Sequence, residues 1–340
     1  MMKSKKYTGS FPIVQTFEAA ALKCRICDNQ ENNQNFVARE MMFGTKDEFA
    51  YFECGRCGCL QIVEFPESMA RYYPQAFFGI DQDLKKKKVI KDVALALNQK
   101  ISFLHNDRMT LKLISSLFPH SNILNIIRKT NTMLNSRILE VGCGKGTLML
   151  ALKKWGFRKI TGIDPYSCEK IDKNLEILKM SIHELPASEK YDLVIFDHSY
   201  EHIPDQFETL AKVSTILTKK GTCVIRMPVK TDYIWKRYGL NWVQLDAPRH
   251  FFIHTLESIR LLAEKGNLQI ESVVFDSTEF QFWGSEQYKE NIPLRAENSY
   301  SVNPQNSMFT EEDIVRFREM ARELNAKFQG DQAEFYLKKK

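Results

Sequence analysis

The chain has 340 residues, of which 44% are hydrophobic and 26% are charged. This composition is typical of a soluble globular protein and excludes wholesale disorder. The formal charge of +6 is the balance of 48 basic and 42 acidic residues, which disfavours a nucleic-acid partner.

The sequence contains no stretch that approaches the roughly 18 apolar residues of a membrane helix. Its basic start is followed by Thr8, Gly9 and Ser10 rather than by the apolar run of a secretion signal. We therefore predict a cytoplasmic protein without a membrane span. Because the cytosol keeps thiols reduced, the eight cysteines are not expected to form a disulfide framework.

Residues 1–75 are predicted to form a zinc-ribbon-like domain of short hairpins. Cys24 and Cys27 form one C-x-x-C pair, and Cys54 and Cys57 form a second. Each pair can offer two thiolates from one tight turn, and two such turns complete a closed tetrahedral site. We therefore predict structural Zn²⁺. An iron–sulfur site and redox-active pairs are the alternatives, and Cys59 is a further thiol close by.

Residues 76–132 are predicted to form a helical linker or lid. Their apolar residues recur at mixed three- and four-residue spacing, as Val89, Val93 and Leu97 illustrate. The lysine run 85–88 is interpreted as the solvated face of a helix, with phosphate binding as the alternative. This segment would connect the cysteine-rich block to the main domain.

Residues 133–282 alternate between predicted strands and helices. Strands are expected at 137–141, 159–163, 175–180, 191–196, 222–227 and 269–275, and helices at 146–155, 205–217 and 256–264. This alternation predicts an α/β fold with a Rossmann-like parallel sheet covered by helices on both faces. Residues 283–340 are predicted to be a loop followed by one helix that begins at Thr310, a plausible N-cap.

A glycine-rich turn lies between the first of these strands and the first helix. It contains Gly142, Gly144 and Gly146, which allow a tight bend and a close approach of the backbone to a ligand. Asp164 follows the second strand, where a carboxylate can accept hydrogen bonds from both hydroxyls of a ribose. A nicotinamide-binding loop would have glycine where this chain has Thr147.

The G-x-G-x-G turn, the Asp164-Pro165 pair and the strand 191–196 with Asp197 after it resemble the class I S-adenosylmethionine-dependent methyltransferase family over residues 136–275. The resemblance implies that the glycine turn passes under the methionine and ribose parts of the cofactor and that Asp164 binds the ribose. An α/β domain whose glycines only form a turn is the alternative. The cofactor-binding residues that the resemblance implies are Glu140, Gly142, Cys143, Gly144, Gly146, Asp164, Pro165, Ser181, Ile182, Asp197 and His198.

Two later segments, 198–205 and 246–254, hold four of the seven histidines. Loops at the carboxyl ends of parallel strands line the ligand crevice, so both segments can supply chemistry. We expect His202 and His250 to act as proton acceptors, with a helix cap and a packed loop histidine as the alternatives. Arg249 could bind an anionic substrate group or form a structural ion pair. Trp242 could stack on the substrate or lie in the core.

Cysteine pairs ahead of such a core, together with the segment 245–250, are similar to a bacterial group that methylates nucleotide-linked sugars and surface polysaccharides. The substrate implied is a small molecule or a glycan precursor. The residues after Phe282 are too few for the larger C-terminal domain of the C-methylating members, so we expect methylation on oxygen. The alternatives are an RNA methyltransferase and a non-catalytic cofactor-binding scaffold. The sequence indicates neither the acceptor nor an oligomeric state.

Overall fold

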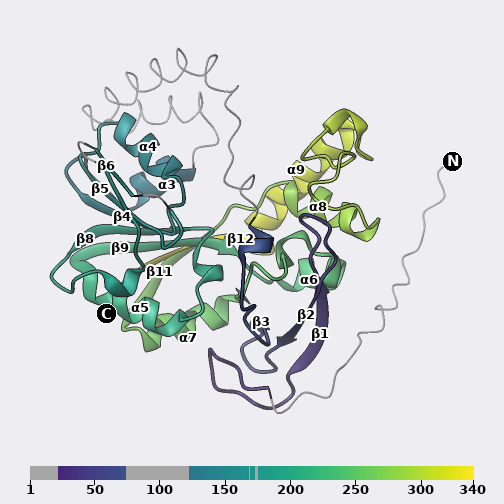
Figure 1. Ribbon diagram of the computed structural model, residues 1–340, viewed down its shortest axis with the longest axis horizontal. Helices are drawn as coiled ribbons and strands as arrows, with labels where there is room; N and C mark the ends of the chain where they lie inside the picture. Colours follow the sequence, from purple (N-terminus) through teal and green to yellow (C-terminus); the bar gives the residue numbers. More distant parts are fainter. Residues whose placement is uncertain (1–21, 74–121, 168, 173–174) are drawn as a thin grey trace.

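The computed structural model describes residues 22–73, 122–167, 169–172 and 175–340, which are organised around two β-sheets (Figure 1). The larger sheet has the strand order β11-β12-β9-β8-β4-β5-β7-β6, and the smaller sheet has the order β1-β2-β3-β10. Most of the predicted helical linker 76–132 lies outside the described residues. Within the described ranges, none of the helices combines the length and hydropathy needed to span a bilayer.

Strands and helices follow one another along the described ranges. The strands are β1 (Gln34–Arg39), β2 (Glu48–Glu53), β3 (Leu60–Ile62), β4 (Arg137–Val141), β5 (Lys159–Ile163), β6 (Lys170–Asp172), β7 (Leu175–Leu178), β8 (Tyr191–Asp197), β9 (Leu217–Pro228), β10 (Phe252–Ile253), β11 (Leu268–Phe275) and β12 (Gln332–Lys339). The helices are α3 (Asn122–Lys129), α4 (Thr147–Lys154), α5 (Gln206–Ile216), α6 (Asp232–Tyr238), α7 (Leu256–Lys265), α8 (Phe280–Lys289) and α9 (Glu311–Ala326).

The centre of the large sheet is parallel, as the alternation of strands and helices predicts. The pairs β9–β8, β8–β4, β4–β5 and β5–β7 all run in the same direction. Neighbouring residues of β4 point to opposite faces: Ile138 clusters with residues of α3 and α4, and Leu139 with residues of α5 and α7. Figure 1 shows these two pairs of helices on opposite sides of the sheet. Because both faces are covered, the central strands are almost continuously apolar. The loops after β4, β5, β7 and β8 consequently share one edge of the sheet.

The sheet is not completed by β11 alone, and this corrects the expectation drawn from the sequence. β12 lies between β9 and β11 and runs antiparallel to both. The interpretation of residues 283–340 as a loop and one helix therefore omitted a strand. It also omitted α8, which extends from Phe280 to Lys289 and includes buried polar residues such as Gln281 and Ser285.

The small sheet joins the cysteine-rich block to the main domain. β10 pairs with β3, so residues from within 133–282 extend the sheet of residues 1–75. The Tyr51 hydroxyl donates to the His250 carbonyl at 2.8 Å, and Lys230 forms an ion pair of 2.7 Å with Glu53. The two blocks therefore form one packed body across the predicted boundary.

Candidate active site

The glycine turn follows β4 and has a left-handed backbone. The φ angles are +75° at Gly142, +50° at Gly144 and +71° at Gly146, a region that side chains disfavour. A Cβ at Gly142 would lie 2.4 Å from Ser199 Cβ, and one at Gly146 would lie 2.5 Å from Ile177 Cδ1. A Cβ at Gly144 would meet nothing within 4 Å in the described structure. Gly144 therefore presents its backbone on an open side of the turn.

Asp164 lies against this turn at the end of β5. Its Oδ2 accepts a hydrogen bond from the Gly144 N–H at 3.0 Å, and its Oδ1 accepts from Tyr166 N at 2.8 Å and Ser167 N at 3.0 Å. A carboxylate offers about four lone-pair sites, so these three bonds leave capacity for about one further donor, such as a hydroxyl of a ligand. The structure thus brings together the two features that the sequence pattern pairs. Pro165, next to Asp164, is exposed.

Glu140 adds a buried carboxyl beneath the turn. The residue is 6% exposed, and its Oε2 has no hydrogen-bond partner in the described part of the chain. Burial, together with the charges of Asp197 and Asp164, raises the pKa of Glu140 well above its usual range. An unsatisfied buried oxygen is costly, so this position fits a ligand that brings hydrogen-bonding groups of its own.

The other predicted cofactor residues fall around the same edge. Ser181 and Ile182 begin a short 3-10 turn after β7, where the Asp164 N–H donates to Leu178 O at 3.1 Å. The Cys143 thiol is buried, so only the backbone of this residue can face the turn. Asp197 ends β8 and forms an ion pair of 2.9 Å with Arg226, which also pairs with Asp276 at 2.5 Å.

His198 follows Asp197 with a φ of +52°, and its Nδ1 lies 3.5 Å from Glu201 Oε1. Burial lowers the pKa of His198, but the contact with the Glu201 carboxylate outweighs burial, so the net shift is upward.

The two histidines predicted as proton acceptors lie side by side, although 47 residues separate them in the chain. Their ring centroids are 4.9 Å apart. His202 Nδ1 lies 2.6 Å from the carbonyl of Arg249, and His250 Nδ1 lies 2.8 Å from the carbonyl of Gln244. His202 does not cap the next helix, whose N-cap is Asp205. His250 is buried, and burial lowers its pKa to about 4.

Both predicted substrate residues must be corrected. The Arg249 guanidinium is 1% exposed, and it pairs with Asp246 through Nε at 2.9 Å and Nη2 at 2.6 Å and with Glu40 at 2.8 Å. Arg249 therefore forms structural ion pairs and has no access to a substrate anion. Trp242 is fully buried and donates from Nε1 to Asp331 at 2.9 Å, so it belongs to the core.

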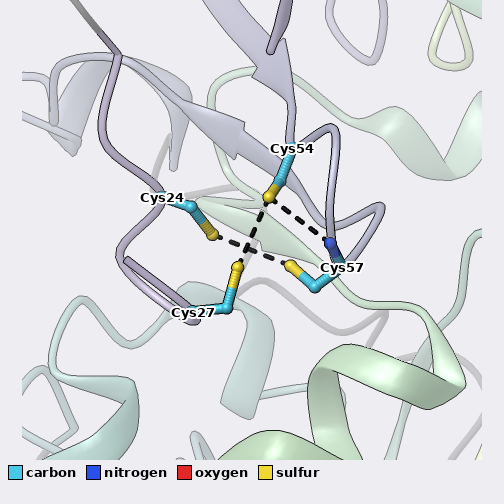
Figure 2. A group of neighbouring side chains, drawn as sticks. All are labelled: Cys24, Cys27, Cys54 and Cys57. Atoms are coloured by element: carbon cyan, nitrogen blue, oxygen red, sulfur yellow. Dashed lines mark hydrogen bonds between the residues drawn. The ribbon is translucent and has the colours of Figure 1, made fainter. Parts of the chain in front are cut away.

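The four predicted metal ligands converge on one point, as Figure 2 shows. All four Sγ atoms lie within 4.8 Å of one another; Cys24 and Cys57 are 3.7 Å apart, and Cys27 and Cys54 are 3.5 Å apart. Zn–S bonds of about 2.3 Å place the sulfurs of a tetrahedral site about 3.8 Å apart. Cys59 lies outside this cluster, with its Sγ 3.8 Å from His254 Nδ1.

The sulfur atoms also receive hydrogen bonds, which suits thiolates rather than thiols. Gln61 Nε2 donates to Cys24 Sγ at 2.9 Å, and the N–H of Cys57 donates to Cys54 Sγ at 3.4 Å. Such surrounding donors orient metal ligands and favour their charged form.

Glu201 is the residue that the sequence interpretation passed over. It lies between His198 and His202 in a segment chosen for its histidines, yet its side chain is fully buried beside both rings of the histidine pair. The signal was available in the spacing, because an acidic residue next to a histidine after a buried strand is itself a candidate ligand or orienting group.

Comparison with known proteins identifies the class. A family model described as a methyltransferase domain matches residues 99–273, just over half of the chain. The chain therefore belongs to this family of methyltransferase domains, which agrees with the glycine turn, the Asp164 contact and the parallel sheet.

Individual relatives are distant. The malonyl-[acyl-carrier protein] O-methyltransferase of Acetivibrio thermocellus is 25% identical over 204 residues, 54% of this chain and 72% of the relative. The ubiquinone biosynthesis O-methyltransferase of Rickettsia bellii is 26% identical over 158 residues, 42% of this chain and 65% of the relative, less than two thirds of its length. A SAM-dependent methyltransferase structure from Archaeoglobus fulgidus has 21% identity and a TM-score of 0.40, covering 68% of this chain and 99% of that one.

Proposed function

We propose that this protein is an S-adenosylmethionine-dependent methyltransferase that methylates an oxygen atom of a small molecule or glycan precursor, such as a sugar or nucleotide-sugar. The observation that carries the proposal is the contact between Gly144 and Asp164 on the open side of the glycine turn. Family membership supports the reaction class. The relatives named as O-methyltransferases support oxygen as the acceptor, and the sugar class rests on the cysteine-pair layout.

The residues around the turn fit the proposed cofactor. Asp164 would bind the ribose hydroxyls, and the buried Glu140 would meet polar groups of the ligand. Ser181 and Ile182 would border the adenine, and Asp197 and His198 the methionine end. When bound, the cofactor supplies a sulfonium methyl group, whose S–C bond breaks as the C–O bond to the acceptor forms, leaving the electron pair on sulfur.

The protein's remaining task is to align the acceptor and handle its proton. His202 and His250 are the proposed residues, because His202 follows Asp197 and His198 at the end of β8 and the His250 ring packs against it. The hydroxyl proton would leave the acceptor on this side. If turnover of the true acceptor stays at the wild-type level in both His202→Ala and His250→Ala, this assignment is wrong.

We also propose that Cys24, Cys27, Cys54 and Cys57 bind a structural Zn²⁺. The sulfur separations, the N–H···S bonds and the burial of all four residues support a closed tetrahedral site. Its role would be to stabilise the small sheet, since a four-thiolate zinc ion has no open position for chemistry.

A binding experiment tests the cofactor site. Titration of the purified protein with S-adenosylmethionine should give saturable binding, and a nicotinamide dinucleotide should give none. Asp164→Asn should weaken cofactor binding by about 10–100-fold, because hydrogen bonds to a charged group contribute about 1.5–3 kcal/mol. The matched control is Asp192→Asn. Asp192 also accepts a hydrogen bond from a backbone N–H, that of Arg137, but it lies at the start of β8, away from the edge of the sheet where the glycine turn lies. Equal affinities of wild type and Asp164→Asn would contradict the proposal.

A transfer experiment tests the acceptor class. Labelled S-adenosylmethionine would be incubated with the protein and with separated nucleotide-sugars, polysaccharide precursors and RNA. We expect label in a sugar-containing fraction. Label only in RNA would favour the nucleic-acid alternative, and tight cofactor binding without transfer to any fraction would favour a non-catalytic scaffold.

A further inference from the structure

The carboxylate of Glu201 is buried, and its contacts among the described residues are long ones to histidine rings. The residue has no exposed surface, and neither side-chain oxygen makes a hydrogen bond within the described parts of the chain. The nearest ring nitrogens, His198 Nδ1 at 3.5 Å and His250 Nε2 at 3.9 Å from Oε1, are beyond normal hydrogen-bond lengths. A buried carboxylate in this state is costly unless a cation or donor satisfies it.

The histidine pair is oriented toward this carboxylate. Because the Nδ1 atoms of His202 and His250 lie within 2.8 Å of backbone carbonyls, they must carry protons and donate them. The neutral ring then keeps its lone pair on Nε2. A ring nitrogen from each histidine and an oxygen of Glu201 all lie within 4.8 Å of one another. Anchoring of Nδ1 by a carbonyl is the arrangement by which proteins orient histidines that bind metals.

The surrounding charges favour a cation. Asp246 Oδ2 lies 3.8 Å from His250 Nε2, and Glu40 Oε1 lies 2.8 Å from Arg249 Nη2. Arg249 pairs with both of these carboxylates, which leaves the charge of Glu201 uncompensated by that guanidinium. Two imidazoles and one carboxylate suit divalent first-row transition metals and leave coordination positions open. Bonds of about 2.0–2.2 Å would draw the three ligand atoms to roughly 3–3.5 Å from one another.

We propose that Glu201, His202 and His250 bind a divalent transition-metal ion that holds the oxygen of the methyl acceptor. The site lies beside the glycine turn, because Ser199 Oγ donates to Val141 O at 2.6 Å and Ser199 packs against Gly142. A metal-bound hydroxyl loses its proton more readily. With the ion bound, the two imidazoles would act on the acceptor through the ion rather than as direct proton acceptors, and the hydroxyl proton would pass to water. This role rests on the proposed methyl transfer, whereas metal binding does not.

The test is a titration of the whole chain with Co²⁺ after the cysteine cluster has been filled with Zn²⁺. Co²⁺ bound by nitrogen and oxygen lacks the thiolate absorption that it would show at the cysteines, so the two sites are distinguishable. We expect wild type to bind one further equivalent without thiolate absorption. Affinity should fall about tenfold or more in Glu201→Gln and in His250→Gln, since even indirect partners of a metal site change affinity by about 10–100-fold.

The control is His183→Gln, an exposed histidine outside the cluster, which should bind Co²⁺ as wild type does. His202→Gln, at a partly exposed position, covers the case in which a buried variant fails to fold. Absence of a second equivalent in wild type, or wild-type affinity in the folded variants, would overturn the proposal. Specific Co²⁺ binding by a protein that transfers no methyl group would keep the metal site and remove the proposed enzymatic function.

Discussion

The N–H of Gly144 donates a hydrogen bond of 3.0 Å to the carboxylate of Asp164, which connects the loop after β4 to the loop after β5. This bond holds the backbone of the glycine turn against the Asp164 carboxylate, the group proposed to bind a ribose, at the edge of the sheet. Gly144 is open on its other side, while Gly142 and Gly146 are closely packed. The three glycines therefore have different reasons for lacking a side chain, and substitutions can separate them.

Gly144→Ala should reduce cofactor affinity with a limited loss of stability. Its Cβ would meet no protein atom within 4 Å but would occupy the side open to a ligand. We expect about tenfold weaker binding, which corresponds to about 1.4 kcal/mol, and a loss of about 1–2 kcal/mol in folding from the left-handed backbone. Gly146→Ala is the comparison: its Cβ would lie 2.5 Å from Ile177 Cδ1, so thermal unfolding should show the larger loss. Identical behaviour of the two variants would contradict this division.

Cys54→Ser should abolish metal binding at the sulfur cluster, whereas Cys59→Ser should retain it. Cys54 lies 3.5 Å from Cys27 within the cluster, and Cys59 contacts Leu60 O and His254 instead. Metal analysis of wild type and Cys59→Ser should give roughly one zinc per chain, as expected for a closed four-cysteine site. Stoichiometric metal at the cluster in Cys54→Ser, read from the thiolate absorption of the Co²⁺-loaded protein, would show that Cys54 is not a ligand.

Arg249→Met should destabilise the fold by about 3–5 kcal/mol, because it would leave Glu40 and Asp246 as uncompensated buried charges. The free energy of unfolding in urea measures this loss. Arg260→Ala is the control, since Arg260 makes only exposed pairs with Glu257 and Glu264, and little change is expected. If Arg249→Met instead has the same free energy of unfolding as wild type, the buried ion pairs of Arg249 do not stabilise the fold.

Asp331→Asn should change how stability depends on pH. Burial raises the pKa of Asp331 from 3.8 to about 6, although Gln244 and Trp242 donate hydrogen bonds to its carboxylate. Between these values the folded state binds more protons than the unfolded chain, so stability falls as the pH rises through this window. The expected loss is about 3 kcal/mol, since each pKa unit corresponds to about 1.4 kcal/mol. The free energy of unfolding, measured from pH 4 to pH 6, should fall with rising pH in wild type and fall less steeply in Asp331→Asn. Equal slopes in the two proteins would contradict this role of Asp331.

The features that sequence reasoning recovered depend on local spacing. The glycine turn and Asp164 belong to neighbouring parallel strands, so their chain positions alone indicate that they meet. The four cysteines were recoverable for a similar reason, because each pair is one tight turn. The family match and the α/β sheet agree with these interpretations.

The features that it missed depend on partners far away in the chain. Glu40 contacts Arg249 across 209 residues, and a pattern around Arg249 carries no trace of that ion pair. β12 reads as polar because Glu334 interrupts its apolar residues, yet Glu334 is buried and accepts a hydrogen bond of 2.6 Å from the Tyr336 hydroxyl. A charged residue that is hydrogen-bonded in this way can lie inside a sheet, although composition alone would assign such a residue to the surface.

The pairing of β10 with β3 makes the amino-terminal cysteine block a structural support for the segment that contains His250. Phe252 and Ile253 of β10 follow His250 after one intervening residue, and the Tyr51 hydroxyl of β2 donates a hydrogen bond to the His250 carbonyl. In a truncated protein that begins after residue 75, the edge of β10 and the His250 carbonyl would lose these hydrogen-bond partners. The block at the start of the chain is therefore part of the scaffold that aims the imidazole of His250, and it cannot be removed as an independent attachment.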